Sequence, residues 1–285
     1  MGNIKKEQTF ITWKIDKKII ETEDYKLNNK VAKKYSKKNF NTLAKKYTTI
    51  LPKDVYSLLK INKKVWNSLK YNGADLGGGV GVVSSVIAKK KIINKIYCVE
   101  PVENAVTKCQ PIIKNKILNK DKYKVVSVLG TFDNIELKKS SLDFCIAWDA
   151  MHHSSNLLKT LKEVKKVLKK NGRFVIVDRA HNNSTTDLEI KRMENVVYGK
   201  EFLKSNSLPL NKILTRKMNG EREYRFKEWE SSFRKSGFRI KERIIVKENH
   251  HKALKEKNDD NIKEKVVKFK IGGFDKKKII YMLGK

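Results

Sequence analysis

The stretch that decides the fold is Asp75-Leu76-Gly77-Gly78-Gly79-Val80-Gly81. A short strand at residues 74–76 precedes the glycines, and an amphipathic helix beginning near Val82 follows them. Glycine adopts backbone angles that a Cβ forbids and lets the main chain approach a ligand closely. The helix start adds free N–H groups and the positive end of the helix dipole. The stretch predicts a ligand-binding turn, and a purely structural strand-to-helix turn is the alternative.

The spacing of the glycines argues against a dinucleotide-binding turn. The G-x-G-x-x-G pattern would place its third glycine at residue 82 or 84, where this chain has Val82 and Ser84. A phosphate-binding loop with the pattern G-x-x-x-x-G-K-[ST] does not occur either. The ligand is therefore expected to be neither NAD, FAD nor a nucleoside triphosphate held in that way.

Apolar runs and amphipathic stretches alternate on the carboxyl side of the turn. Strands are predicted at 96–99, 125–129, 144–148 and 174–177, and the strongest helix at 157–168. Strands that read as unbroken apolar runs are buried on both faces, and intervening helices make them parallel through right-handed crossovers. The pattern predicts an α/β fold with a doubly wound, mostly parallel sheet.

The chain is expected to divide into two parts, the second of which contains an insertion. Residues 1–70 are expected to form an N-terminal cap or helical segment, and residues 71–285 the main domain. An insertion at about 182–222 follows the fifth strand, where it would lie beside the carboxyl ends of the strands as a substrate lid. A helix at 226–235 and strands at 238–246 and 278–283 complete the domain.

Glu100 comes directly after the second strand, nineteen residues beyond Gly81. A carboxylate at that place can accept hydrogen bonds from both hydroxyls of a ribose. The alternative interpretation is a surface acid at the end of a strand. The position between an apolar run and Pro101 favours the first interpretation, so a ribose-containing ligand is expected.

Four motifs together resemble the class I S-adenosylmethionine (SAM)-dependent methyltransferase family. They are Asp75-x-Gly77-x-Gly79-x-Gly81, Val99-Glu100-Pro101, Asp143-Phe144…Trp148-Asp149-Ala150-Met151-His152-His153 and Leu161-Lys162-Glu163-Val164…Gly172-Arg173-Phe174-Val175-Ile176. The resemblance covers residues 70–180 well and the regions 1–40 and 182–222 not at all. It implies a seven-stranded Rossmann-like sheet, SAM as cofactor and methyl transfer as the reaction.

The resemblance also implies a cofactor site. Asp75, Gly77 and Gly79 would contact the methionine part of SAM, and Glu100 its ribose. The acid that often meets the adenine amino group is replaced here by Thr131 and Phe132. The rest of the implied cofactor set is Gly78, Gly81, Pro101, Ala147 and Trp148. Trp148 is expected either to face the sulfonium through a cation–π contact or to pack in the core.

His152 and His153 follow the fourth strand, where the family places residues on the substrate side. A neutral imidazole there could remove a proton from an attacking hydroxyl, and a structural histidine is the alternative. Asp149 is the second candidate. Arg179 is expected to face the mouth of the site, together with Asp178 and His181, and to hold an anionic substrate. No cysteine and histidine spacing predicts a metal site.

Composition leaves the acceptor open. The net charge is +34, yet only nine of the 65 basic residues are arginine, the better phosphate ligand. Dispersed lysines can result from codon bias alone, so they are not by themselves a sign of nucleic-acid binding. We therefore expect a small-molecule or glycan acceptor, anionic or neutral, with RNA methylation as the alternative and non-catalytic SAM binding as a third option. The three cysteines, an absent signal peptide and no apolar span predict a cytoplasmic protein.

Overall fold

The computed structural model describes residues 10–22, 25–30, 46–205, 208–246, 268–271 and 274–285. The elements of the N-terminal part are β1 (Phe10–Thr12), α1 (Lys17–Ile20), α4 (Leu51–Lys60) and α5 (Lys63–Ser68). The central part contains β2 (Tyr71–Leu76), α6 (Val82–Ala88), β3 (Ile93–Glu100), α7 (Gln110–Leu118), β4 (Val125–Leu129), β5 (Leu142–Trp148), α8 (Leu157–Val167) and β6 (Leu168–Ala180). The remaining elements are α9 (Asp187–Glu194), α10 (Lys200–Ser205), α11 (Phe226–Lys235), β7 (Arg239–Val246), β8 (Lys268–Ile271) and β9 (Phe274–Gly284).

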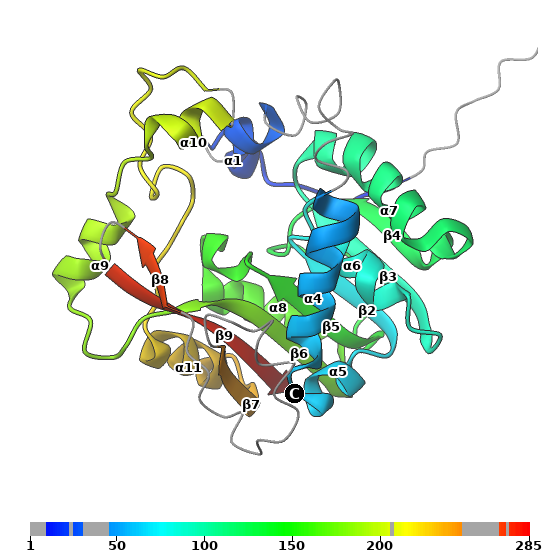
Figure 1. Cartoon of the computed structure of the whole chain (residues 1–285). Helices are drawn as coiled ribbons and strands as arrows, with labels where there is room; N and C mark the ends of the chain where they lie inside the picture. Colours follow the sequence, from blue (N-terminus) through cyan, green and yellow to red (C-terminus); the bar gives the residue numbers. More distant parts are fainter. Residues whose placement is uncertain (1–9, 23–24, 31–45, 206–207, 247–267, 272–273) are drawn as a thin grey trace, which may run out of the picture.

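The strands form one sheet in the order β1-β4-β3-β2-β5-β6-β9-β7, with β8 paired to β9 (Figure 1). The pairs from β1 to β6 are parallel, and β9 runs antiparallel to both β6 and β7. The expected α/β fold with a mostly parallel, doubly wound sheet is confirmed. The order reverses between β2 and β5, which makes the carboxyl ends of these strands the natural place for a ligand.

The described residues form a sheet of nine strands, which differs from the expected number of seven. The two additional strands are β1, which pairs with β4, and β8, which pairs with β9. Residues 10–12 pair with Ser127–Leu129 at one edge, so the N-terminal segment contributes backbone to the sheet as well as helices. The sequence could not indicate β1, because three residues in a lysine-rich region are too few to show a period.

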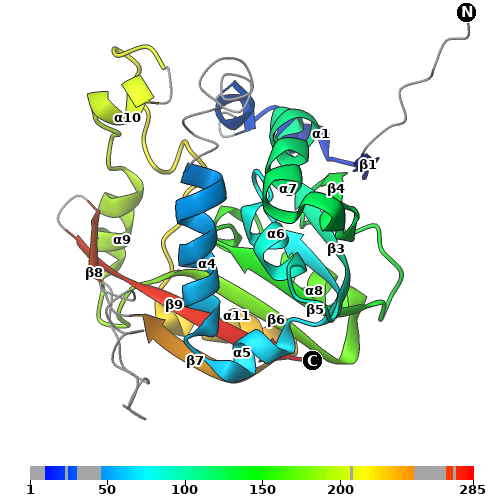
Figure 2. The ribbon, with the colours of Figure 1, turned by 45° about the vertical axis from the view of Figure 1, so that its right-hand side comes forward.

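Helices cover both faces of the sheet (Figures 1 and 2). One face packs against α4, α6 and α7, and the other against α8 and α11. Strand β5 shows why helices pack on both faces, because its side chains point alternately to one face and the other. Phe144 and Ile146 belong to the first core, while Cys145 and Ala147 belong to the second, and all four are fully buried. A strand with two apolar faces is held inside such a sandwich.

The sequence of residues 188–202 predicts one helix in the insertion, and the structure differs. The insertion forms α9 and α10 with an irregular stretch between them. Three insertion residues, Leu203, Leu208 and Leu214, pack around Leu27 of the N-terminal segment. Figure 1 shows α10 on the same side of the molecule as the N-terminal segment. The two regions that the sequence motifs left unassigned therefore meet.

The end of α8 also differs from expectation. The pair Asn171-Gly172 is typical of a left-handed helix end and predicts that the helix continues to it. In the structure α8 ends at Val167, and β6 begins at once with Leu168. Leu168 is fully buried and pairs with Leu142 of β5. Tertiary pairing thus overrides the local turn signal.

Among the described residues, no helix is long and apolar enough to cross a membrane.

Candidate active site

The glycine turn joins β2 to α6. Gly77, Gly79 and Gly81 have φ values of +75°, +52° and +88°, in the left-handed region that favours glycine. A Cβ on Gly77 would lie 2.6 Å from Cβ of Ala150, and one on Gly78 would lie 2.5 Å from Sγ of Cys98. A Cβ on Gly79 would meet no described atom within 4 Å. The turn is therefore packed on one side and open on the other.

Asp75 lies beneath this turn and is fully buried. Its Oδ2 accepts hydrogen bonds from the backbone N of Ser84 at 3.0 Å and from Oγ of Ser84 at 2.6 Å. Its Oδ1 is buried without a hydrogen-bond partner among the described residues. Burial raises the pKa of Asp75 to about 6, although the bonds from Ser84 oppose the rise. A buried acceptor of this kind calls for a donor from a ligand or a water molecule.

Glu100 connects the end of β3 to the turn. Its Oε2 accepts a hydrogen bond from the backbone N of Gly79 at 2.9 Å, and its Oε1 accepts one from the backbone N of Val102 at 3.0 Å. The side chain is nearly buried, at 8% exposure. Each carboxylate oxygen can accept more than one hydrogen bond, so the fixed carboxylate keeps capacity for ligand hydroxyls.

A cavity of about 650 Å³ opens above the turn. Its size lies within the range of roughly 300–1,000 Å³ that is typical of small-molecule sites. The residues expected from the sequence that line it are Gly77, Gly79, Glu100, Pro101, Thr131, Phe132, Asp149 and His153. The open face of Gly79 and the fixed Glu100 carboxylate fit a ligand that carries a ribose, and the buried Asp75 oxygen lies beneath the turn that would hold it.

Other residues expected at the site lie outside the described lining of the cavity. These residues are Asp75, Gly78, Gly81, Ala147, Trp148 and His152. Ala147 is fully buried in the core. Trp148 packs against the opposite core, and Nζ of Lys278 lies 5.1 Å from the centre of its ring. The cation over Trp148 in the structure is thus a lysine of the protein itself.

Several lining residues were not expected from the sequence. The N-terminal segment contributes Ile19, Thr22, Tyr25, Asn28 and Tyr47. The insertion contributes Lys217, Met218, Gly220 and Arg222. Asp133 lines the cavity near Phe132, and its carboxylate accepts a hydrogen bond from Oγ1 of Thr160. The aromatic residues scattered among the N-terminal lysines were the available signal, but their spacing shows no period.

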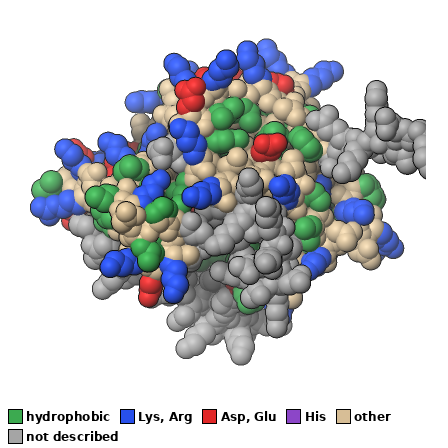
Figure 3. All heavy atoms as spheres, turned by 90° about the horizontal axis from the view of Figure 1, so that it is seen from above, with side chains coloured by type: hydrophobic (Ala, Val, Ile, Leu, Met, Phe, Trp, Pro, Cys, Tyr) green, Lys and Arg blue, Asp and Glu red, His purple; other side chains and the backbone are tan. Residues whose placement is uncertain are grey.

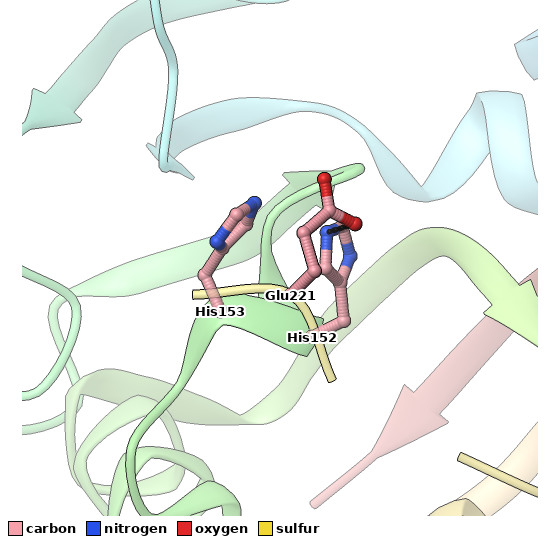
Figure 4. Close-up of side chains that lie close together, drawn as sticks. All are labelled: His152, His153 and Glu221. Atoms are coloured by element: carbon pink, nitrogen blue, oxygen red, sulfur yellow. Dashed lines mark ion pairs between the residues drawn. The ribbon is translucent and has the colours of Figure 1, made fainter. Parts of the chain in front are cut away.

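The two histidines have different surroundings, although their ring centres are only 4.3 Å apart (Figure 4). His152 is buried, and its Nδ1 donates to Oδ1 of Asp178 at 2.8 Å. His153 lines the cavity. Burial, with help from the charge of His152, lowers the pKa of His153 to about 3. His153 is therefore neutral at physiological pH and faces the ligand space, whereas His152 faces the protein.

An ion-pair network joins the end of β6 to the insertion. Arg179 contacts Glu221 and Glu223, and Arg216 contacts the same two carboxylates. His181 Nε2 donates to Oε2 of Glu223 at 2.7 Å. Burial alone would raise the pKa of Glu223, but the bond from His181 and the two guanidinium charges lower it to about 2. The network holds the insertion against the sheet.

This network corrects the expectation for Arg179. Its side chain is only 7% exposed and is bonded to carboxylates of the protein, so Arg179 is not open to an anionic substrate. Asp178 is buried against His152 rather than placed at the mouth. Asp149 keeps an exposed side chain, at 62%, with Oδ1 lying 3.9 Å from Nη1 of Arg179.

The side chains of His152, His153 and Glu221 lie within 4.8 Å of one another, a spacing that can suit a metal ion (Figure 4). Nε2 of His152 is 3.7 Å from Oε2 of Glu221. Two guanidinium groups, from Arg179 and Arg216, already bind the same carboxylate and compete with a cation. We treat the group as part of the hydrogen-bonded network and assign it no metal.

The comparisons with known proteins agree with this geometry. Residues 74–176 match the family model described as a methyltransferase domain. The fold resembles a SAM-dependent methyltransferase from Leishmania major, with 12% identity, a TM-score of 0.53 and coverage of 94% of this chain and 88% of that one. It also resembles a candidate sarcosine dimethylglycine methyltransferase from Galdieria sulphuraria, with 17% identity, a TM-score of 0.54 and coverage of 82% and 84%.

The [4+2]-cyclase SpnF has the same fold, with 14% identity, a TM-score of 0.52 and coverage of 75% of both chains. No curated protein sequence matches the chain. The fold and the turn define an α/β protein that binds a nucleoside-containing cofactor. The methyltransferase-domain match over residues 74–176, together with this fold, indicates a SAM-dependent methyltransferase with SAM as its cofactor.

Proposed function

We propose that this enzyme transfers the methyl group of SAM to a small-molecule or glycan acceptor held in the cavity above the glycine turn. The observation that carries the proposal is that one cavity has walls from the turn, from the N-terminal segment and from the insertion. The leucine cluster around Leu27 joins the last two walls. A site closed in by two added segments suits a compact acceptor better than a long polymer.

The cofactor-binding roles remain those that the family resemblance implies. We propose Asp75, Gly77 and Gly79 for the methionine part and Glu100 for the ribose. We further propose Thr131 and Phe132 for the adenine. Gly78, Gly81 and Pro101 shape the turn and the strand end around these groups. Ala147 and Trp148 act from the core behind the pocket.

When bound, SAM supplies a methyl group that is already electrophilic. The protein therefore has to align an acceptor atom, and alignment can contribute roughly 7–11 kcal/mol. We propose His153 as the group that accepts a proton from an acceptor hydroxyl, because its ring lines the cavity. Its lowered pKa keeps the ring neutral but also makes it a weak base, so the proton transfer contributes less than alignment does. Such a base adds only about 10²–10⁴-fold. Asp149, also on the cavity wall, is the second candidate.

His152 is proposed to position its neighbours. Its bond to Asp178 crosses from the segment after β5 to the end of β6, and its ring lies against that of His153. Replacing it would disturb the buried network before it affected chemistry. We therefore assign proton transfer to His153 and support to His152.

RNA methylation is the second candidate function, and the net charge of +34 is the observation that favours it. Lysine and arginine side chains are spread over the face in Figure 3 and do not gather in one stripe. A scattered field attracts nucleic acid weakly and without orientation. A third possibility, binding without methyl transfer, follows from the rule that a fold does not fix its chemistry.

The test is to incubate the protein with methyl-labelled SAM and a cell extract, and then to separate labelled products by size. Label in molecules below a few hundred daltons, or in glycans, supports the proposal. Label in ribonuclease-sensitive material supports the alternative instead. Absence of label from every fraction, with SAM still bound in a calorimeter, would support binding alone. The variant Gly79→Arg is the control that lacks the cofactor.

The proposal includes a reducing compartment, the cytoplasm. Cys98, Cys109 and Cys145 are all buried, and none of them forms a disulfide bond among the described residues. Free thiols are usual in reduced cell compartments. The oligomeric state has no bearing on the cavity as described.

A further inference from the structure

We propose that the acceptor carries an anionic oxygen group, a carboxylate or a phosphate, which binds to Arg222 with assistance from Lys217. This inference rests on the proposed methyl transfer and adds the chemical class of the acceptor. Both cations belong to the insertion, and both line the cavity together with His153. They would hold the acceptor beside the group that takes its proton.

Arg222 is oriented but keeps donors for a ligand. Its Nη1 donates to the backbone carbonyl of His153 at 3.2 Å, which fixes the guanidinium next to the proposed base. A second, longer contact reaches the carbonyl of Gly220 at 3.5 Å. Guanidinium has five N–H donors in a planar fork that matches carboxylate and phosphate groups. Both bonds go to carbonyl groups, so Arg222 forms no direct ion pair with a carboxylate of the described residues, and Asp133 acts on its charge only from a greater distance.

The other arginines near the site do not share this property. Arg179 and Arg216 are both buried, and each contacts Glu221 and Glu223. Among the described residues, no carboxylate lies within 4.0 Å of Arg222 or Lys217. Arg179 of β6 and Arg216 of the insertion thus bind carboxylates of the protein interior, whereas Arg222 and Lys217 of the insertion line the cavity.

The acids on the cavity wall form no ion pair within 4.0 Å with Arg222 or Lys217 among the described residues. Glu100 is held by the backbone N–H groups of Gly79 and Val102 at the strand ends. Asp133 accepts from Thr160, and its pKa, raised by burial, is lowered in part by the charge of Arg222. Asp149 lies toward Arg179. Acids therefore mark the strand ends of the cavity, and cations mark the insertion.

The first experiment uses the wild-type protein. A small-molecule extract is separated on an anion-exchange column at pH 7.5, and each fraction is offered to the protein with labelled SAM. We expect the acceptor in the retained fractions. Treatment with alkaline phosphatase then distinguishes the two groups, because it destroys a phosphate acceptor and leaves a carboxylate one unchanged. An acceptor that flows through the column unretained would overturn the inference.

The second experiment compares variants with the active fraction as substrate. Arg222→Gln should lower kcat/KM for the acceptor by roughly 10- to 100-fold, the effect of losing hydrogen bonds to a charged group. Arg222→Lys should recover part of the loss, and Lys217→Gln should cause a smaller one. Arg234→Gln, which makes the same change on an exposed residue of α11 outside the cavity lining, should have no effect.

The affinity for SAM separates this inference from the proposed function. It should stay within about twofold in Arg222→Gln, because the anion belongs to the acceptor. An equal loss of SAM affinity would mean that Arg222 holds the carboxylate of the cofactor, and the inference would fail. A wild-type protein that binds SAM yet labels no fraction would overturn the methyl transfer itself. If Arg222→Gln does not fold, the column result with the wild type still decides.

Discussion

Three neighbouring glycines of the turn have different surroundings, and only Gly79 has open space where a Cβ would stand. The backbone of Gly77 and Gly78 is packed against Ala150 and Cys98. Gly79 combines a left-handed backbone with open space. A side chain there would enter the cavity with little disturbance to the core. Sequence spacing alone treats the three positions as equivalent.

Gly79→Arg should therefore fold and lose SAM binding, because the new side chain occupies the cavity. Gly77→Ala should instead unfold at lower denaturant, since it adds left-handed strain of about 1–2 kcal/mol and a clash with Ala150. Titration calorimetry with SAM and urea unfolding measure the two effects. Gly199→Arg, at a site with nothing within 4 Å, is the matched control. Retained SAM affinity in Gly79→Arg would contradict this placement of the cofactor.

His153 gives the stability a dependence on pH. The unfolded chain binds a proton near the ordinary pKa of 6.5, whereas the folded chain does so only near 3. The unfolded state thus holds more protons between these values, so the free energy of unfolding falls as the pH is lowered. From pH 7 to 5.5 the fall should be about 1 kcal/mol. Urea unfolding of His153→Gln should lack this part of the slope, and parallel curves would refute the assignment.

The sequence could predict the residues of the turn and Glu100 but not the partners of the histidines. The turn and its acid are local signals, separated by one strand and one helix. His152 meets Asp178 and Glu221, which come from two later segments of the chain. Only the crossover that sets β6 beside β5 brings them together. Arg179 was misplaced for the same reason, since its carboxylates lie more than forty positions further on.

At the scale of elements, the insertion is attached to the sheet by charge on one side and by leucines on the other. Arg179 and His181 at the end of β6 bind Glu223, while Leu203 and its neighbours pack on Leu27. The sequence predicted the insertion but not its break into α9 and α10. That break depends on contacts with the N-terminal segment, which no local pattern reveals.

Glu223→Gln should destabilise the protein by roughly 3–5 kcal/mol, because it leaves Arg179 and Arg216 partly uncompensated in a buried setting. Urea unfolding gives the size, and limited proteolysis within 182–222 should become faster. Glu163→Gln breaks a partly exposed pair with Lys166 and should cost less than about 1 kcal/mol. Equal costs for the two variants would show that the network does not hold the insertion.

At the scale of the whole molecule, the charge is large but dispersed. Lysine provides most of it, and the face in Figure 3 shows blue side chains between apolar ones. Composition could give the sign and size of this field but not its arrangement, which depends on the fold. The doubly wound sheet was predictable, because strands buried on both faces leave a clear pattern. The edge strand β1 was not, because its three residues carry no such pattern.

Binding to a single-stranded RNA homopolymer should therefore be weak and electrostatic. The apparent affinity should fall by at least about 10²-fold between 50 and 200 mM salt, as counterions compete for the phosphates. Fluorescence anisotropy measures the affinity, and labelled SAM in the same samples reports methyl transfer. Binding that survives high salt, together with label on the RNA, would favour the alternative function.

The order of strands has a consequence for how the chain is made. β9 lies between β6 and β7, and β7 reaches the sheet through β9 among the described strands. The ribosome, however, produces β7 well before β9. Because synthesis proceeds at roughly 5–20 residues per second, β9 is made on the order of ten seconds after β6. During that time the edge of β6 has no partner strand, and we expect chaperones to bind the nascent chain until β9 pairs with β6.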